Sequence, residues 1–130
     1  MRIARALYDQ MIEHAREEAP NECCGMVAAR DGEAVKLYRT TNVEHSPYRF
    51  VIDPNEQVRI YNEIEAEGNA LAIYHSHTRT EPEPSETDIR FAKEWPGVLW
   101  IIVGLERAEA DVRLWRIENG SVEPVELVVE

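Results

Sequence analysis

Two segments of the chain carry apolar residues at the spacing of an α-helix. The first runs from Ala4 to Glu18, and Pro20 stops it. The second starts at Pro54, a favourable first helical position after Asp53, and ends near Gly68. The apolar positions are Ala4, Leu7, Met11, Ile12 and Ala15 in the first segment and Val58, Ile60, Tyr61 and Ile64 in the second. Both segments are predicted to be amphipathic helices.

Shorter runs of alternating or continuous apolar residues are typical of β-strands. Residues 23–43 divide into two strands at Asp31-Gly32, a dipeptide that suits a tight hairpin turn. Residues 111–117 and 122–129 alternate on either side of Asn119-Gly120, which predicts a closing hairpin. The chain therefore contains at least two hairpins.

Three further strands and a third helix complete the prediction. Residues 48–53 and 70–77 read as strands, and residues 98–105 are apolar on both faces, as in a central strand. Residues 85–93 read as a helix. The pattern predicts one α+β domain over residues 1–130, with a mostly β framework flanked by about three helices.

The composition limits the partners of this domain. The chain has 25 acidic and 14 basic residues and a formal net charge of -11, which would repel a phosphate backbone, so we expect no nucleic-acid partner. No apolar run approaches the roughly 20 residues that cross a bilayer. Residues 1–20 carry charges throughout, unlike a signal peptide. We therefore expect a soluble, cytoplasmic protein without a membrane partner.

Several residues with reactive side chains are predicted to be ordinary structural residues. Cys23 and Cys24 are adjacent, so a disulfide between them would be strained. They are predicted to be buried at the start of a strand, with a catalytic thiol as the weaker alternative because no base is nearby in the sequence. His14, on the polar side of the first helix, and His45, in a loop, are predicted to be solvated, since neither has a partner at ligand spacing.

His75 and His77 form a candidate metal site. Residues two apart in a strand point to the same face, so both imidazoles can reach one ion while Ser76 points away. A tetrahedral zinc ion would then need a third protein ligand and an open position for water. Asp88 can supply that ligand, because Ser85 is a good N-cap and places Asp88 about one helical turn in, facing the histidines. Two histidines alone are a weak signal, since strand histidines are often polar residues at the rim of a sheet.

The spacing His-x-His-x7-Ser-x2-Asp, from His75 to Asp88, resembles the signature of the JAMM (MPN-plus) metalloproteases. Glu22, in the segment NECCG, stands where that family has a glutamate after its first helix. The resemblance covers nearly the whole chain. It implies a single MPN/JAMM domain of the cytidine-deaminase-like type, with a mixed, mostly antiparallel curved sheet.

The same resemblance implies roles for five residues. One Zn²⁺ per chain would be held by His75, His77 and Asp88. Glu22 would be the general acid/base, and Ser85 would donate a hydrogen bond near the developing oxyanion. Ser85 could equally be a plain helix cap. The choice of Glu22 over the other glutamates depends on the resemblance.

Within the family, the segments YHSHTRTEPEPSETD and NECCG most resemble bacterial hydrolases that release cysteine from a sulfur-carrier protein in cysteine biosynthesis. This implies cleavage of the peptide-type bond after the C-terminus of a ubiquitin-like (β-grasp) sulfur carrier. The alternatives are a JAMM isopeptidase acting on other ubiquitin-like conjugates and a non-catalytic MPN scaffold. A zinc-storage module is a further class, but it would need a fourth protein ligand.

The segment from Arg49 to Ile52 is the candidate binding site for the carrier's tail. It is predicted to be a strand at a sheet edge, because it follows a proline and a polar loop. An extended tail would bind there through backbone hydrogen bonds, with either Phe50 or Val51 presenting its amide outward. Arg49 or Arg79 could pair with the carboxylate of a departing amino acid. The alternative is that this segment only completes the sheet.

Overall fold

Three helices are present in the structure, a computed structural model that describes residues 1–130. They are α1 (Arg5–Glu18), α2 (Pro54–Ala66) and α3 (Glu86–Ala92), so the three predicted helices are confirmed. Asp53 caps α2, because its side chain accepts hydrogen bonds from two N–H groups of the first helical turn. None of the helices is both long and apolar enough to span a bilayer.

Eight strands form one sheet in the order β7-β6-β5-β4-β2-β3-β1-β8. In chain order they are β1 (Arg2–Ile3), β2 (Cys24–Arg30), β3 (Glu33–Thr40), β4 (Ala70–His77), β5 (Leu99–Gly104), β6 (Asp111–Glu118), β7 (Ser121–Val125) and β8 (Val128–Val129). Four neighbouring pairs are antiparallel and three are parallel. The predicted α+β fold with a mixed, mostly antiparallel sheet is therefore confirmed.

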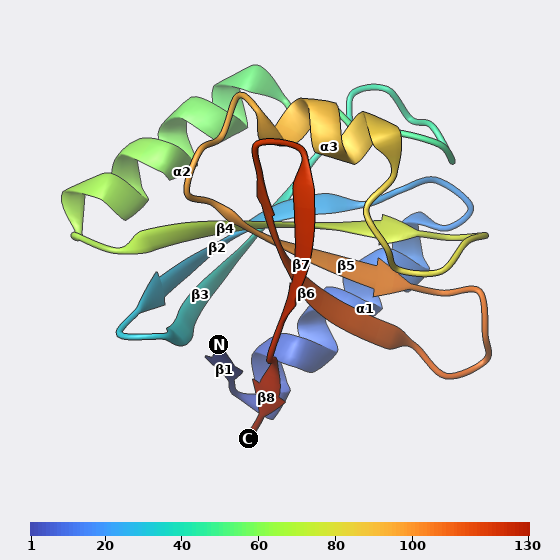
Figure 1. Cartoon of the computed structure of the whole chain (residues 1–130), viewed down its shortest axis with the longest axis horizontal. Coiled ribbons are helices and arrows are strands. Elements are labelled where there is room, and N and C mark those ends of the chain that lie inside the picture. Colours follow the sequence, from blue (N-terminus) through green and yellow to red (C-terminus); the bar gives the residue numbers. More distant parts are fainter.

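The sheet curls until its two edges approach each other. β7 and β8 lie at opposite ends of the strand order, yet only two residues separate them in the chain. The two chain termini consequently lie side by side (Figure 1). The prediction of one strand over residues 122–129 was wrong, because the chain leaves β6 after Val125 and pairs with β1, where the N–H of Val128 donates to the carbonyl of Met1.

The curled sheet has a hydrophobic core on each face. α1 covers one face, and α2 and α3 cover the other (Figure 1). Side chains alternate along a strand, so Tyr74 lies in the core under α1 and its neighbours Ile73 and His75 point to the opposite face. On that face, Ile73 belongs to the second core and the ring of His75 stacks on Phe50. The odd-numbered residues at the end of β4 therefore face the helical layer that contains α3.

The segment 48–53 is not a strand, contrary to the prediction. It has one isolated bridge, between Asn42 and Ile52. The N–H of Val51 donates to the side-chain oxygen of Asn42 at 3.0 Å instead of to a strand backbone. The two backbone hydrogen bonds of the bridge, from Val43 to Val51 and from Asp53 to Thr41, are not continued into a ladder, and the segment remains an extended loop.

The prediction for His14 was also wrong. Its side chain is only 3% exposed, and Nδ1 lies 2.7 Å from the Tyr74 hydroxyl. Leu7 and Met11, two turns and one turn earlier on α1, lie on the same helical face, so the helical spacing could have identified His14 as buried. Burial lowers the pKa of His14 to about 4. His45, by contrast, is exposed as predicted.

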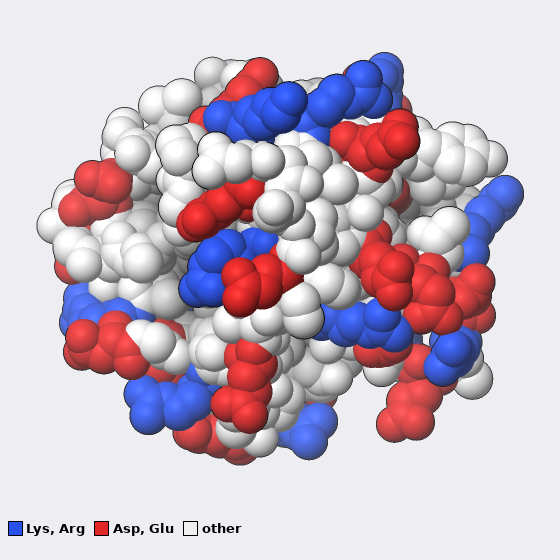
Figure 2. All heavy atoms as spheres, viewed as in Figure 1, with Lys and Arg blue, Asp and Glu red and all other residues white.

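Acidic and basic side chains are interspersed on the surface. On the face drawn in Figure 2, a few basic side chains adjoin one another along the upper edge, and elsewhere basic side chains lie among acidic ones. Among the basic residues of the chain, Lys36 pairs with Glu63 and Arg39 pairs with Glu17. Most of this face is therefore of mixed charge.

Candidate metal centre

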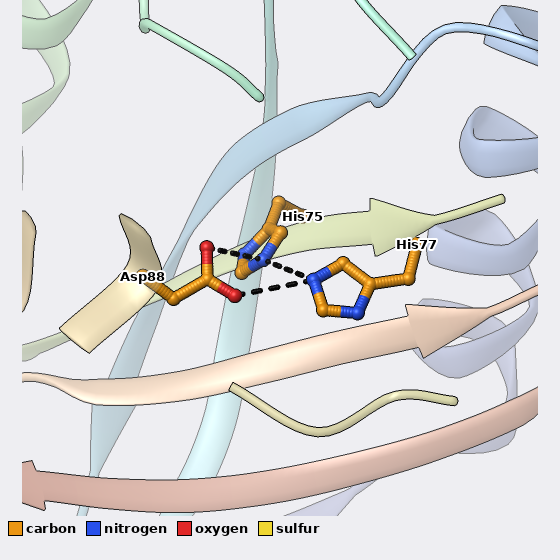
Figure 3. Close-up of side chains that lie close together, drawn as sticks. All are labelled: His75, His77 and Asp88. Atoms are coloured by element: carbon orange, nitrogen blue, oxygen red, sulfur yellow. Dashed lines mark hydrogen bonds and ion pairs between the residues drawn. The ribbon is translucent and has the colours of Figure 1, made fainter. Parts of the chain in front are cut away.

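The end of β4 and the start of α3 bring His75, His77 and Asp88 together (Figure 3). The two Nε2 atoms are 3.2 Å apart. The Asp88 carboxylate oxygens lie 3.2 Å from Nε2 of His75 and 3.1 Å from Nε2 of His77. All three side chains are at most 7% exposed. Three potential ligand atoms therefore converge on one buried point.

The spacing and chemistry of these atoms fit a zinc ion. Zinc bonds to nitrogen and oxygen of about 2.0–2.2 Å imply ligand atoms roughly 3.3–3.5 Å apart in a tetrahedron, close to the separations of 3.1–3.2 Å in the cluster. Two imidazole nitrogens and one carboxylate oxygen are also a common donor set for zinc. The cluster can hold a metal ion.

Different contacts orient the two histidine rings. Nδ1 of His77 lies 3.0 Å from the carbonyl oxygen of Glu81. An N–H at this Nδ1 donates to that carbonyl and leaves the lone pair of Nε2 free for a metal. Nδ1 of His75 is buried without a hydrogen-bond partner, and its ring stacks on Phe50 with centroids 4.5 Å apart and planes inclined by 26°. Packing therefore orients His75.

The loop that carries Glu81 is fixed to β6. Arg113 pairs with Glu81 at 3.0 Å and with Asp111 at 2.7 Å. The indole N–H of Trp115 donates to the carbonyl of Pro82 at 2.9 Å. These contacts hold the Glu81 carbonyl in place, so they also orient the ring of His77.

A reciprocal pair of hydrogen bonds fixes Asp88 at the start of α3. The N–H of Asp88 donates to the hydroxyl oxygen of Ser85 at 3.1 Å, and the N–H of Ser85 donates to Oδ2 of Asp88 at 3.0 Å. Burial disfavours the ionised carboxylate, but the nearby His75 and His77 and the Ser85 N–H outweigh it and hold the pKa of Asp88 well below its usual range. Asp88 is therefore an anionic group held in place beside the two imidazole rings.

Glu22 lies beside this cluster. It is 5% exposed and shares a pocket of about 180 Å³ with His77, Ser85 and Arg79. The pairing of β2 with β4 brings it there, since Cys24 is opposite His75 and Glu22 is two residues earlier. Burial raises the pKa of Glu22 to about 8. A carboxyl group with a pKa near neutrality can both accept and return a proton.

The remaining predicted site residues differ in their surroundings. Arg49 is engaged by Glu44 at 2.9 Å, whereas Arg79 is exposed at the Glu22 pocket and has no salt bridge. Phe50 and Ile52 point inward and are 7% and 1% exposed, and Val51 is 36% exposed.

Sequence reasoning missed three features of the site: the stacking of Phe50 on His75, the clamp that Arg113 forms by pairing with Glu81 and Asp111, and the buried amide of Asn42. Nothing in their local patterns indicated these contacts.

Neither the two cysteines nor the largest surface cavity contributes a reactive group to the candidate site. Cys23 and Cys24 are buried free thiols, as predicted, and burial raises the pKa of each to about 12, which makes them poor nucleophiles. A groove of about 590 Å³ between α2 and the turn after α3 lies at the opposite end of β4 from His77. It contains none of the clustered side chains.

The sequence matches known proteins along most of its length. The family model described as prokaryotic homologues of the JAB domain matches residues 4–118. A CysO-cysteine peptidase from Mycobacterium tuberculosis is 36% identical, with 97% of this chain and 90% of that protein covered. A desampylase from Pyrococcus furiosus is 32% identical, with coverage of 84% and 76%.

Solved structures share the fold. A solution structure of a Desulfitobacterium hafniense protein has a TM-score of 0.84 at 27% identity and covers 100% of this chain and 93% of its own. A structure described as a JAMM metalloprotease-like zinc site has a TM-score of 0.63 at 21% identity, with coverage of 100% and 97%, and is similar in fold. The chain belongs to the family of prokaryotic homologues of the JAB domain, and it is a peptidase of the JAMM type.

Proposed function

We propose that this protein is a zinc-dependent hydrolase that cleaves the peptide-type bond after the C-terminus of a ubiquitin-like sulfur-carrier protein and releases cysteine. One observation carries the proposal. Three buried ligand atoms of His75, His77 and Asp88 lie 3.1–3.2 Å apart next to a pocket that also contains Glu22 and Ser85. This is the arrangement that metal-assisted hydrolysis requires.

His75, His77 and Asp88 would hold the zinc ion, one per chain. A bound zinc ion supplies a Lewis acid that polarises the scissile carbonyl and makes a water molecule more acidic. Glu22 would take the proton from the attacking water and transfer it to the nitrogen of the leaving group. The Ser85 hydroxyl oxygen accepts the Asp88 N–H, so its own hydrogen is free to donate to the developing oxyanion.

The carrier's tail would bind along residues 49–52. Phe50 and Ile52 have no hydrogen bond at their backbone N–H and C=O groups, whereas Val51 uses both of its groups internally. An extended tail could therefore pair with Phe50 and Ile52, as in strand addition. Because Phe50 stacks on His75, a tail bound there would end beside the metal ligands.

The leaving group is proposed to be a free amino acid. Arg79 borders the pocket of Glu22 without a salt bridge, while Arg49 is occupied by Glu44. A free guanidinium can bind an α-carboxylate in a bidentate way. The 36% identity to a CysO-cysteine peptidase supports cysteine as that amino acid. Free cysteines at positions 23 and 24 suit a reducing cytoplasmic location.

The second candidate is cleavage of isopeptide conjugates of ubiquitin-like proteins. The 32% identity to a desampylase from Pyrococcus furiosus supports this alternative. A non-catalytic scaffold is disfavoured, because it would have no use for a complete ligand set beside a buried Glu22.

Hydrolysis of defined conjugates tests the proposal. The zinc-loaded protein is incubated with a carrier that bears a C-terminal cysteine and, separately, with the same carrier joined to a lysine side chain, and the products are identified by mass spectrometry. We expect release of cysteine that a strong chelator abolishes and added zinc restores. Cleavage of the lysine conjugate alone would favour the second candidate, and chelator-resistant hydrolysis would exclude the zinc mechanism.

Synthetic tails test where the carrier binds. Single N-methyl groups are introduced at successive residues of the tail, which removes one backbone donor at a time without changing the enzyme. Strand addition predicts that KM rises at alternate positions. A uniform response would show that the tail binds elsewhere.

A further inference from the structure

The Asn42 side chain is a buried hub between two parts of the site. It is 7% exposed. Its Nδ2 donates to the carbonyl oxygens of Glu22 at 3.0 Å and Arg49 at 3.1 Å. Its Oδ1 accepts from the N–H groups of Val51 at 3.0 Å and Glu44 at 3.1 Å. An amide offers two donor hydrogens and two acceptor lone pairs, so Asn42 uses its full capacity.

The backbone of Glu22 depends on the loop that follows β3. Glu22 precedes β2, which starts at Cys24, so no ladder hydrogen bond of the sheet holds it. Its N–H donates instead to the carbonyl of Ser46 at 2.9 Å, and its carbonyl accepts from Asn42. Both peptide groups of Glu22 are thus held by residues 42–46.

The same loop forms the substrate side of the site. Pro47 and Tyr48 line the pocket that contains Glu22, and Phe50 stacks on His75. The Arg49 carbonyl and the Val51 N–H both bond to Asn42. The segment proposed to bind the tail and the backbone of Glu22 are therefore connected through one side chain.

We propose that Asn42 is a positioning residue that couples the segment 49–52 to the placement of the Glu22 carboxylate. The inference rests on the proposed function, which assigns the proton transfer to Glu22. One donor bond of Asn42 holds the carbonyl of Glu22. Its other donor bond, to Arg49, and its two acceptor bonds hold the loop. A carrier tail that pairs with Phe50 and Ile52 would stabilise that loop and, through Asn42, the reactive position of Glu22.

Two substitutions separate the donor bonds of Asn42 from its acceptor bonds. Asn42→Asp keeps both acceptor positions and removes both donors, whereas Asn42→Ala removes all four bonds. Tyr74→Phe is the control, because it deletes a buried hydrogen bond on the opposite face of the sheet. The readouts are kcat and KM for the carrier conjugate, bound zinc and the melting temperature, with kinetics measured at a temperature where circular dichroism shows every variant folded.

We expect kcat to fall to a similar extent in Asn42→Asp and Asn42→Ala, by about 10- to 100-fold, since a displacement of about 1 Å in a catalytic group has effects of this size. KM should change more in Asn42→Ala, because only that variant loses the bonds to Val51 and Glu44. The melting temperature should fall in both variants, in Asn42→Asp because a carboxylate oxygen replaces the donor that faces the carbonyls of Glu22 and Arg49. Zinc should stay at one per chain. Tyr74→Phe should lower the melting temperature and leave kcat within about twofold of the parent, an effect much smaller than that of a lost catalytic contact.

Glu22→Gln, assayed in parallel, distinguishes the possible failures. An inactive Glu22→Gln with a fully active Asn42→Asp would overturn the role of Asn42 and leave the proposed function intact. Activity in both would instead remove Glu22 from the mechanism. If kcat falls in proportion to the melting temperature in every variant, including Tyr74→Phe, then Asn42 contributes only to stability and the proposal is wrong. If Asn42→Ala does not fold, Asn42→Ser replaces it with the same expectations.

Discussion

Nδ1 of His77 lies 3.0 Å from the backbone carbonyl oxygen of Glu81. This contact directs Nε2 of the same ring toward the proposed metal position. The Glu81 side chain is in turn held by Arg113, on β6. A strand that contributes no side chain to the cluster therefore helps to orient one of the proposed metal ligands.

Arg113→Gln is predicted to weaken zinc binding by about 10-fold, the lower end of the range for losing a partner that orients a metal ligand. The substitution releases the Glu81 loop and lets the His77 ring turn. Competition with a chromophoric chelator measures the dissociation constant. Arg116→Gln, at an exposed position on the same strand, is the matched control and should bind zinc like the parent. Equal affinities in both variants would contradict the clamp.

Asp88→Ala is predicted to abolish stoichiometric zinc binding, and Ser85→Ala is predicted to leave it unchanged. Each removes one of the two reciprocal hydrogen bonds at the start of α3, which should destabilise the zinc-free protein by about 1 kcal/mol. Only Asp88→Ala removes a ligand, so only that variant should lose stoichiometric zinc. Ser85→Ala should keep zinc and lose about 100-fold in kcat, as expected for one oxyanion donor. Metal analysis and steady-state kinetics check both, and a fully active Ser85→Ala would leave Ser85 as a helix cap alone.

Glu22→Gln is predicted to retain zinc and lose about 10²- to 10⁴-fold in kcat, the usual range for a general acid/base. The amide is similar in size to the carboxyl group, so the fold should persist. Metal content, circular dichroism and kcat are measured together. Loss of zinc in this variant would mean that Glu22 is a ligand.

The buried pair of His14 and Tyr74 predicts a pH dependence of stability. The folded-state pKa of His14 is lowered to about 4, below the unfolded value of about 6.5. Between these values the unfolded chain binds a proton that the folded protein does not, so stability falls as the pH falls. The predicted loss from pH 7 to pH 4.5 is about 2 kcal/mol.

Urea unfolding of the zinc-free protein measures this effect. His14→Gln can keep a hydrogen bond to Tyr74 but cannot titrate, so its stability should fall less over the same pH range. The difference between the two slopes isolates His14 from His75 and His77, the proposed metal ligands, which both proteins share. Parallel slopes would show that His14 titrates normally.

Elements whose geometry is local could be predicted from the amino-acid sequence alone. Helical spacing located α1, and the pair Asp53-Pro54 located the start of α2. The period of two in a strand put His75 and His77 on one face, and the Ser85 cap put Asp88 one turn into α3. Each of these relationships spans at most 14 residues, so the fixed geometry of a helix or strand is enough to predict it.

Relationships between residues that are distant in the chain became visible only in the folded protein. The tertiary structure placed Glu22 beside His77, buried His14 against Tyr74, and sent β8 to pair with β1. It also turned residues 48–53 into a loop, because the Asn42 side chain bonds to Val51. Such contacts depend on which strands become neighbours and on which buried polar groups find partners, and a local periodicity contains neither kind of information.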